Sequence, residues 1–313
     1  MRIVLEGCDC TGKSTLAQVL AKRIKEVFGV SEVMHFHEGL PPVMINLFEY
    51  YALKALAYDF CIHDRLHLGE RTYGMVYRCD DRLGPIGQHI IDHIIRSNGF
   101  GIICNPPLED VVKCWQKRID CEYVKDQSSL RRIYESYRTY SEGDGGAWWM
   151  IDPFQLLEQD AVLRRIKVHS IRYKSIPFIY GIGPSTAETL IVGEMSNHPV
   201  HDLPFFSTTG SSAYLIKTLM GLGIGHDYYL TNASYIDGSL RLMRPIIKEL
   251  RRLKRVFALG HQATKLLRQQ EIPCISMPHP QFYNRFKHHE EVDYLKLFKL
   301  GMEANHADQL LLL

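Results

Sequence analysis

The feature that most constrains this chain is the stretch GCDCTGKS, Gly7 to Ser14, because it requires a strand, a tight loop and a helix in that order. It follows the apolar run RIVLE and leads into STLAQVLAKRIKEVF, whose apolar residues recur at helical spacing until Gly29. In this context the spacing G-x-x-x-x-G-K-S is typical of a loop that surrounds phosphate groups with backbone N–H groups at a helix N-terminus. We therefore expect ATP and Mg²⁺ to bind, with Lys13 reaching the outer phosphates and Ser14 coordinating the metal ion. The residues expected to hold the nucleotide are Gly7, Asp9, Thr11, Gly12, Lys13, Ser14 and Thr15.

Two cysteines, Cys8 and Cys10, occupy variable positions of this loop. They are not expected to obstruct it, because side chains at these positions can point away while the backbone amides contact the phosphates.

The first half of the chain alternates short apolar runs with helical stretches, which indicates a parallel sheet with helices on both faces. Its later strand candidates are VMHFHEG, LAYDFCIHDR and FGIICNPP. The glycine-rich stretch SEGDGGAWWMIDP breaks the pattern and predicts the start of an inter-domain region. The expected division is a domain over residues 1–145, a linker with a bridging helix over 146–170, and a second domain over 171–313.

The second half repeats this pattern with the buried-strand candidates TLIVGE, YYLTN, RVFALG and IPCISMPHP. Each candidate ends in a loop with polar residues or glycine. Since ligands bind at the carboxyl ends of parallel strands, these loops predict a binding cleft at one edge of a second sheet. The expected fold class is therefore α/β, with two domains that are each a parallel sheet flanked by helices.

Bulk properties indicate a soluble, cytoplasmic protein. No apolar run among the 313 residues approaches the ~20 residues of a membrane span, and the N-terminus resembles a strand more than a signal peptide. None of the eight cysteines forms a Cys-x-x-Cys pair, so no disulfide framework is expected.

Charge is distributed unevenly along the chain. Residues 1–160 carry 18 basic and 23 acidic side chains, whereas residues 161–313 carry 19 basic and 12 acidic ones. A basic second half is compatible with a polyanionic partner such as DNA. The alternative is that the basic residues form the solvated face of one helix; they are Arg241, Arg244, Lys248, Arg251, Arg252, Lys254 and Arg255.

The stretch EGCDCTGKST resembles the thymidylate kinase family's E-G-x-D-G-x-G-K-S-T, with Cys10 in place of a glycine. Asp64-Arg65 resembles that family's D-R pair at the end of a strand. The resemblance implies that Asp64 lies near the metal ion and the substrate, and that Arg65 lies near the transferring phosphates.

The continuation DRLHLGERTYGMVYR resembles phage and bacterial relatives of the same group, which implies an acceptor pocket near Glu70, Tyr73 and Arg78. Lys117 and Arg118 resemble the family's basic lid, which supplies charge to the transition state; a solvated helix face is the alternative.

The sequence departs from the thymidylate kinase family at one motif, which in that family helps to hold the acceptor phosphate. The family's Arg-Glu-Pro stretch appears here as His37-Glu38 followed by glycine, so Glu38 is retained as an acceptor-site residue and the arginine is missing. Either His37 replaces the arginine weakly or it is simply buried. The missing arginine therefore leaves open an acceptor other than free thymidylate.

The stretch LIVGEMSNHPVHDLPFFSTTG resembles the first motif of the uracil-DNA glycosylase superfamily, with matches at Gly193, Glu194, Pro204, Phe205 and Gly210. Further matches are LTNASY, FALGHQATKLL and HPQFYNRF, all in the family's order. The resemblance implies stacking on a base by one aromatic residue, reading of its Watson–Crick edge by an amide, and a catalytic or phosphate-contacting histidine. The residues that follow from it are Phe205, Asn232, His279 and Arg285. Base excision is less secure, since the first motif has no acidic residue between Glu194 and Asp202, and Cys274 alone cannot hold an iron–sulfur cluster.

Three hypotheses remain open from the sequence. The first is a deoxynucleotide kinase fused to a uracil-DNA glycosylase-like domain. The second is a kinase that phosphorylates a modified pyrimidine, such as a 5-hydroxymethyl base in DNA, while the second domain holds the base. In the third, the second domain only localises the kinase on DNA. An active glycosylase with an accessory kinase domain is a further alternative.

Overall fold

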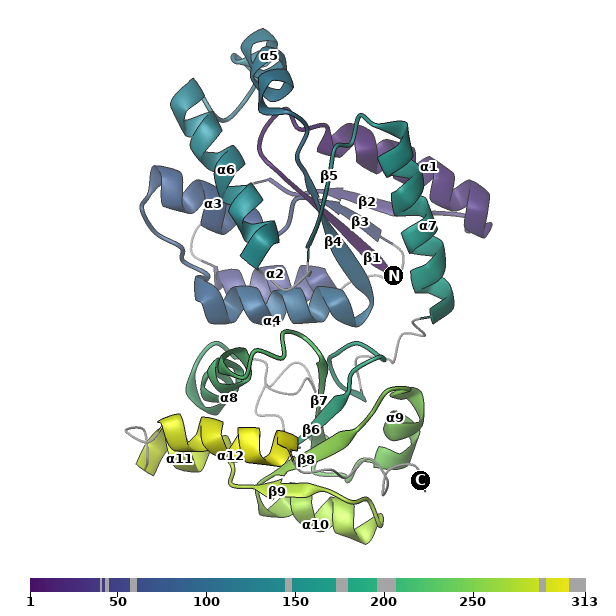
Figure 1. Ribbon diagram of the computed structural model, residues 1–313, viewed down its shortest axis with the longest axis vertical. Coiled ribbons are helices and arrows are strands. Elements are labelled where there is room, and N and C mark those ends of the chain that lie inside the picture. Colours follow the sequence, from purple (N-terminus) through teal and green to yellow (C-terminus); the bar gives the residue numbers. More distant parts are fainter. Residues whose placement is uncertain are drawn as a thin grey trace. The chain divides into compact units, whose positions relative to one another are not determined.

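The computed structural model describes residues 1–39, 41–42, 45–56, 61–143, 148–172, 180–195, 207–286 and 291–303. The chain divides into two compact units, Met1–Arg172 and Tyr173–Leu313. Each unit is α/β, with a parallel sheet flanked by helices, as the sequence predicted (Figure 1).

The first unit contains a five-stranded sheet in the order β2-β3-β1-β4-β5, in which all neighbours are parallel. Its strands are β1 Arg2–Glu6, β2 Met34–His37, β3 Cys61–Asp64, β4 Gly99–Cys104 and β5 Trp148–Ile151. The register pairs Leu5 with Asp64, so the end of β3 lies beside the start of the loop that follows β1.

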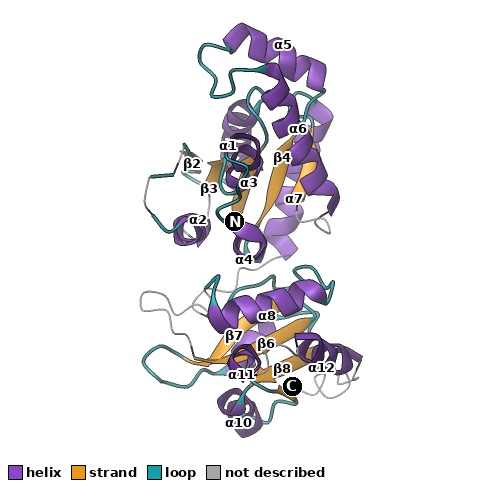
Figure 2. Ribbon diagram, turned by 90° about the vertical axis from the view of Figure 1, so that its left-hand side faces the viewer, coloured by secondary structure: helices purple, strands orange, loops and turns teal. Residues whose placement is uncertain are grey.

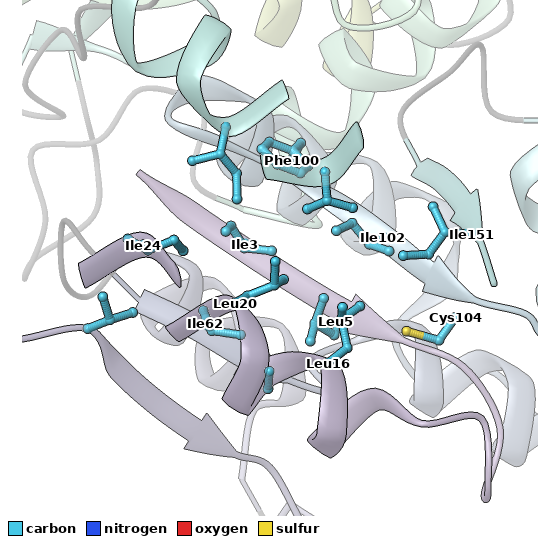
Figure 3. Packing of buried hydrophobic residues seen from close by; sticks show 14 of the residues in the cluster. Ile3, Leu5, Leu16, Leu20, Ile24, Ile62, Phe100, Ile102, Cys104 and Ile151 are labelled. Atoms are coloured by element: carbon cyan, nitrogen blue, oxygen red, sulfur yellow. The ribbon is translucent and has the colours of Figure 1, made fainter. Parts of the chain in front are cut away.

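Helices cover both faces of this sheet (Figure 2). They are α1 Lys13–Phe28, α2 Leu47–Leu56, α3 Leu68–Tyr77, α4 Gly84–Ser97, α5 Leu108–Arg118, α6 Gln127–Gly143 and α7 Leu156–Arg172. On one face, Leu16 and Leu20 of α1 pack on Ile3 and Leu5 of β1 in a continuous apolar core (Figure 3). Burial of each such side chain stabilises the fold by roughly 1.5–3 kcal/mol, which fixes α1 and therefore the loop before it.

The structure differs from the expected domain boundary. Residues 146–170 were expected to link the domains, but β5 pairs with β4 from Gly101↔Trp148 to Cys104↔Ile151. Helix α7 contributes Val162 and Ile166 to the same core as β1. The short apolar run WWMI lies between glycines and a proline, which indicated a linker. Pairing with β4 makes it an edge strand instead.

The second unit contains a four-stranded parallel sheet in the order β7-β6-β8-β9. Its strands are β6 Thr189–Met195, β7 Tyr228–Ser234, β8 Arg255–Leu259 and β9 Ile275–Met277. All four predicted strands are therefore present. Their carboxyl ends meet at one edge of the sheet, as expected.

The helices of this unit are α8 Gly210–Gly221, α9 Met243–Glu249, α10 His261–Gln269, α11 Pro280–Phe286 and α12 Glu291–Glu303. Helices α9 and α10 pack on one face of the sheet through Met243, Ile246 and Leu266. On the other face Phe257 of β8 contacts Phe298 of α12, with ring centroids 4.9 Å apart.

The basic residues between 241 and 255 do not form the face of one helix. Helix α9 ends at Glu249, and Arg241 before it is buried with its guanidinium 3.8 Å from the Tyr235 ring centroid. Arg252 and Lys254 after it each form an ion pair with Glu188, both at 2.7 Å. These basic residues therefore lie in three environments: a buried position before α9, the helix itself, and an ion-paired segment after it.

Within the segments described above, no helix combines the length and the apolar character needed to cross a bilayer.

Candidate phosphate-binding site and candidate base pocket

The loop over residues 7–12, the phosphate loop, connects the carboxyl end of β1 to the N-terminus of α1. Its glycines have left-handed backbone angles, with φ 141° at Gly7 and 81° at Gly12. A Cβ atom on Gly7 would lie 2.6 Å from the carbonyl oxygen of Cys104. Glycine is therefore required there both by conformation and by the close approach of β4.

Lys13 is buried at the start of α1, with its ammonium group folded into the phosphate loop. Its Nζ donates to the carbonyl oxygen of Cys8 at 2.5 Å and to Thr11 Oγ1 at 3.4 Å. Burial, together with the charge of Arg65, lowers the pKa of Lys13. The ammonium thus lies inside the loop that is expected to surround a phosphate group.

Ser14 and Asp64 come together across 50 residues of sequence. Ser14 Oγ donates to Asp64 Oδ2 at 2.5 Å, and the Asp64 side chain is fully buried. The other oxygen, Oδ1, accepts no hydrogen bond from the described part of the chain. Mg²⁺ commonly takes one or two protein oxygens and completes its shell with substrate phosphates and water, so this hydroxyl, together with a carboxylate whose second oxygen is unpaired, fits that ion.

His37 also contacts this carboxylate, with Nδ1 2.9 Å from Asp64 Oδ2, while most of its side chain is exposed. The alternative expected from the sequence, that His37 is simply buried, is therefore wrong. Glu38, the next residue, accepts hydrogen bonds from Lys54 and, at 3.4 Å, from the Tyr50 hydroxyl, both on α2.

A second cluster is centred on Asp9 of the phosphate loop. Its Oδ1 accepts from Arg65 Nη2 at 2.6 Å and from the Tyr73 hydroxyl at 3.0 Å, and its Oδ2 accepts from the Val124 backbone N–H at 3.3 Å. Burial alone would raise the pKa of Asp9, but the charges of Arg65 and Lys13 outweigh that effect and hold the pKa below its ordinary value. Arg65 adopts φ 75°, an unusual angle for a non-glycine residue, which the ion pair helps to maintain.

Glu70 and Arg78, both expected near an acceptor, form an ion pair in which the carboxylate is buried and the guanidinium is partly exposed, and Arg82 joins them. Arg82 was not selected from the sequence, where the only signal was its spacing of twelve residues from Glu70.

Arg118, in the last turn of α5, reaches the phosphate loop indirectly. It pairs with Glu122 at 3.0 Å, and Glu122 Oε1 lies 3.5 Å from Cys10 Sγ. Lys117 has an exposed side chain, which agrees with the alternative of a solvated helix face. Cys8 is buried, and burial raises the pKa of its thiol to about 12, so it is neutral and does not compete for phosphate.

One contact of the phosphate loop was missed because its residues fell in the expected linker. A Cβ atom on Gly12 would lie 2.8 Å from the Phe154 ring and 3.2 Å from Pro153 Cγ. Phe154 is 56% exposed although it covers the loop, so its ring also presents an apolar surface beside the phosphate site. Thr15, the last residue of the motif, has an exposed side chain on α1.

In the second unit, a pocket of about 680 Å³ opens at the carboxyl edge of the sheet. Glu194 and His279, both selected from the sequence, line it together with Gly260, His261, Thr264, Arg268, Ser276, Met277, Pro278 and Phe282. Glu194 Oε1 accepts from the Gln262 backbone N–H at 3.0 Å, so the carboxylate satisfies a free donor at the start of α10.

His279 is partly buried in this pocket. The Gln281 backbone N–H points at its Nδ1 at 3.2 Å, so the neutral ring carries its proton on Nε2. Burial lowers the pKa of His279, and the carboxylate of Glu194 opposes that shift. The pocket thus offers a carboxylate, an N–H donor and the apolar ring of Phe282.

Asn232 lies on β7 directly opposite Gly193 of β6. It is 2% exposed, and its Nδ2 has no hydrogen-bond partner among the residues that the structure describes. Arg285 is exposed in the last turn of α11. Neither Asn232 nor Arg285 lines the pocket. Phe205, expected to stack on a base, lies outside the described residues.

Comparisons with known proteins gave matches among solved structures, whereas no protein-family model and no curated protein sequence matched the chain. The YorR protein of Bacillus subtilis, solved in complex with phosphorylated GDP, is 20% identical with a TM-score of 0.45; the match covers 55% of this chain and 98% of that one. Deoxyadenosine kinase from M. mycoides, solved with the products dCMP and dCDP, is 16% identical with a TM-score of 0.35, over 55% of this chain and 100% of that one. The same kinase with bound dATP gives 15% identity and a TM-score of 0.35, over 53% and 100%. At these identities and TM-scores the likeness assigns no activity to this chain.

Proposed function

We propose that the first unit is an ATP-dependent phosphotransferase whose acceptor is a nucleotide or a pyrimidine base. The observation that carries the proposal is the convergence of Lys13 with the Ser14–Asp64 pair at the N-terminus of α1. A cationic side chain, a loop of backbone amides and a cation-binding oxygen pair are the parts that phosphoryl transfer requires.

In the proposed reaction an oxygen of the acceptor, on a phosphate group or a hydroxyl group, forms a bond to the γ-phosphorus while the bond from phosphorus to the ADP oxygen breaks. A hydroxyl acceptor releases its proton, and ADP carries away the leaving electron pair. Lys13 and Arg65 would stabilise the charge on the phosphoryl oxygens, and Arg118 would add charge from α5. Ser14 and Asp64 would hold Mg²⁺, which neutralises phosphate charge when it is bound.

The test is transfer of label from γ-labelled ATP with Mg²⁺ to thymidylate, to a 5-hydroxymethylated nucleotide, or to oligonucleotides with ordinary and modified pyrimidines. Transfer should occur to at least one acceptor and disappear in Lys13→Ala. Retention of transfer in Lys13→Ala would contradict the assignment of the phosphate loop. Label found only in oligonucleotides would identify a base in DNA as the acceptor and exclude a free-nucleotide kinase.

For the second unit we propose recognition of a pyrimidine base in DNA, of the uracil-DNA glycosylase-like kind. The supporting observations are the buried Nδ2 of Asn232, which has no hydrogen-bond partner in the described part of the chain, and the pocket that Glu194 shares with His279. A buried amide N–H donor without a partner is costly, and a base edge is the type of ligand that would accept from it.

Base excision is the second candidate function for this unit, favoured by the presence of Glu194 and His279 in the lining of one pocket. Abasic sites in uracil-containing DNA that form with the intact protein and not with His279→Ala would establish it. Binding to such DNA without any abasic product would leave base recognition, and equal binding to DNA of every sequence and base would reduce the unit to a DNA-localising module.

A further inference from the structure

The first unit contains an arginine pair, Arg78 and Arg82, held by one buried carboxylate. Glu70, near the start of α3, has only 4% of its side chain exposed. Its Oε1 accepts from Arg78 Nη2 and, at 2.9 Å, from Arg82 Nε, while its Oε2 accepts from Arg82 Nη2 at 3.2 Å. Two guanidinium groups therefore share one carboxylate, and the charge of Asp80 also acts on Arg82.

Both arginines are partly open to solvent, with 39% and 46% of their side chains exposed. A guanidinium has five N–H donors, and Glu70 uses only one nitrogen of Arg78 and two of Arg82. The plane of Arg82 is fixed in advance by its two contacts with Glu70, and Arg78 is anchored on the same buried group through one nitrogen. An anion bound here would therefore meet oriented donors without first ordering two long side chains.

The backbone of α3 is adapted to this arrangement at Gly74. A Cβ atom at position 74 would lie 2.5 Å from Arg78 Nη2, so a larger residue there would displace the guanidinium. The Arg78 side chain returns along its own helix to Glu70 only because Gly74 leaves the path open.

The arginine pair lies close to the phosphate loop without being part of it. Glu70 and Tyr73 are three residues apart on α3 and so share one face of the helix. The Tyr73 hydroxyl contacts Asp9 of the loop at 3.0 Å. Along the helix axis ~4.5 Å therefore separates Glu70, which holds the arginine pair, from Tyr73, which contacts the phosphate loop.

We infer that Arg78 and Arg82 bind a phosphate group of the acceptor other than the one that is transferred. This inference rests on the phosphotransferase function proposed above. It implies an acceptor whose reacting hydroxyl is on the base or sugar and whose own phosphate is bound by the arginine pair. That phosphate is either the monoester of a free nucleotide or a diester of a DNA strand.

The experiment compares the intact protein with Arg82→Gln, using Arg23→Gln as a matched control, since Arg23 is a half-exposed arginine on α1 that pairs with Asp160. The acceptors are a 5-hydroxymethyl pyrimidine nucleoside, its 5′-monophosphate, and a short single strand containing it. We expect Arg82→Gln to raise KM about 10-fold or more for a phosphate-bearing acceptor, with kcat and the KM of the nucleoside unchanged. Arg82→Lys should recover part of the loss, because it keeps the charge but not the fork.

The same comparison identifies the source of the phosphate. A higher KM for the monophosphate indicates a monoester. A higher KM for the strand alone indicates a diester, and the dependence of binding on log salt should then weaken by about 0.7 per lost contact. An equal rise for the phosphate-free nucleoside, or no rise for any acceptor, overturns the inference.

Binding of the monophosphate and the strand, measured by fluorescence anisotropy without ATP, separates this inference from the proposed function. Weaker binding by Arg82→Gln supports the arginine pair even when no transfer is seen. Transfer that depends on Lys13 together with unchanged binding by Arg82→Gln rejects the arginine pair and leaves the phosphotransferase intact.

Discussion

Ser14 and Asp64 share a hydrogen bond of 2.5 Å although one begins a helix and the other ends a strand 50 residues later. The contact follows from the parallel register of β1 and β3, which pairs Leu5 with Asp64 and brings the end of β3 beside the phosphate loop. The buried Oδ1 of Asp64 remains unpaired in the described structure, so the carboxylate can take a cation without losing a second protein partner.

Replacing Asp64 by Asn should lower kcat/KM for phosphoryl transfer by about 100-fold, or about 2.7 kcal/mol, because the neutral amide is a poor ligand for Mg²⁺. Excess Mg²⁺ should recover part of the loss, as seen in a titration of rate against metal concentration. Asp160→Asn, at a half-exposed aspartate on α7, serves as the control. An unchanged Mg²⁺ dependence in Asp64→Asn would show that Asp64 does not hold the ion.

Gly12 and Gly29 allow the effect of local strain to be separated from that of the site. Both have left-handed φ angles, 81° and 63°, but a Cβ on Gly12 would collide with Phe154, whereas a Cβ on Gly29 meets nothing within 4 Å. Each alanine variant should lose about 1–2 kcal/mol of unfolding free energy from the backbone angle. Only Gly12→Ala should also abolish binding of ATP, measured by isothermal titration calorimetry. Loss of ATP binding in both variants would point to global damage instead.

Removing the positive charge beside Asp9 should destabilise the first unit. Arg65→Met leaves a buried carboxylate without its main partner and should cost about 3 kcal/mol in denaturant unfolding at pH 7. The double variant Asp9→Asn/Arg65→Met should recover part of this loss, because it removes the uncompensated charge. Equal stabilities for the single and double variants would mean that the unpaired carboxylate of Asp9 carries no cost.

The same pair predicts the response to acid. Because the pKa of Asp9 is held below its ordinary value, its ionised form stabilises the fold above the unfolded-state pKa of about 3.9. That stabilisation is lost as the pH falls through the lower folded-state pKa. In Arg65→Met the folded-state pKa rises, so acid unfolding followed by circular dichroism should begin at a higher pH than in the intact protein. A coincident acid transition would contradict this account.

A fragment that ends at residue 145 should fail to unfold cooperatively, whereas one that ends at Arg172 should show a single thermal transition. The shorter fragment lacks β5 and α7 and therefore Ile151, Val162 and Ile166, which are fully or almost fully buried. Each contributes roughly 1.5–3 kcal/mol, and together they approach the 5–15 kcal/mol by which a typical domain is stable. Differential scanning calorimetry distinguishes the two fragments, and equal cooperativity would restore the boundary expected from the sequence.

The amino-acid sequence by itself determined the local features of this protein. Helical spacing of Leu16, Leu20 and Ile24 specified α1, and the alternation of short apolar runs with helices specified a parallel sheet in each half. The spacing of glycines and lysine predicted the phosphate loop, because the left-handed angles of Gly7 and Gly12 are features that glycine itself permits. The sequence also predicted that the loops with Glu194 and His279 meet, because the strands of a parallel sheet end at one edge, and both residues line one pocket there.

Only the tertiary structure decided which distant residues meet. Strand register set Asp64 against Ser14, and packing against β4 made Trp148–Ile151 a strand of the first sheet although its flanking glycines and proline indicated a linker. The contacts of Phe154 with Gly12, and of Arg82 with Glu70, join residues with no common sequence pattern. The physical reason is that such contacts depend on buried area and on the pairing of buried charges. Both are properties of the assembled core rather than of any short segment.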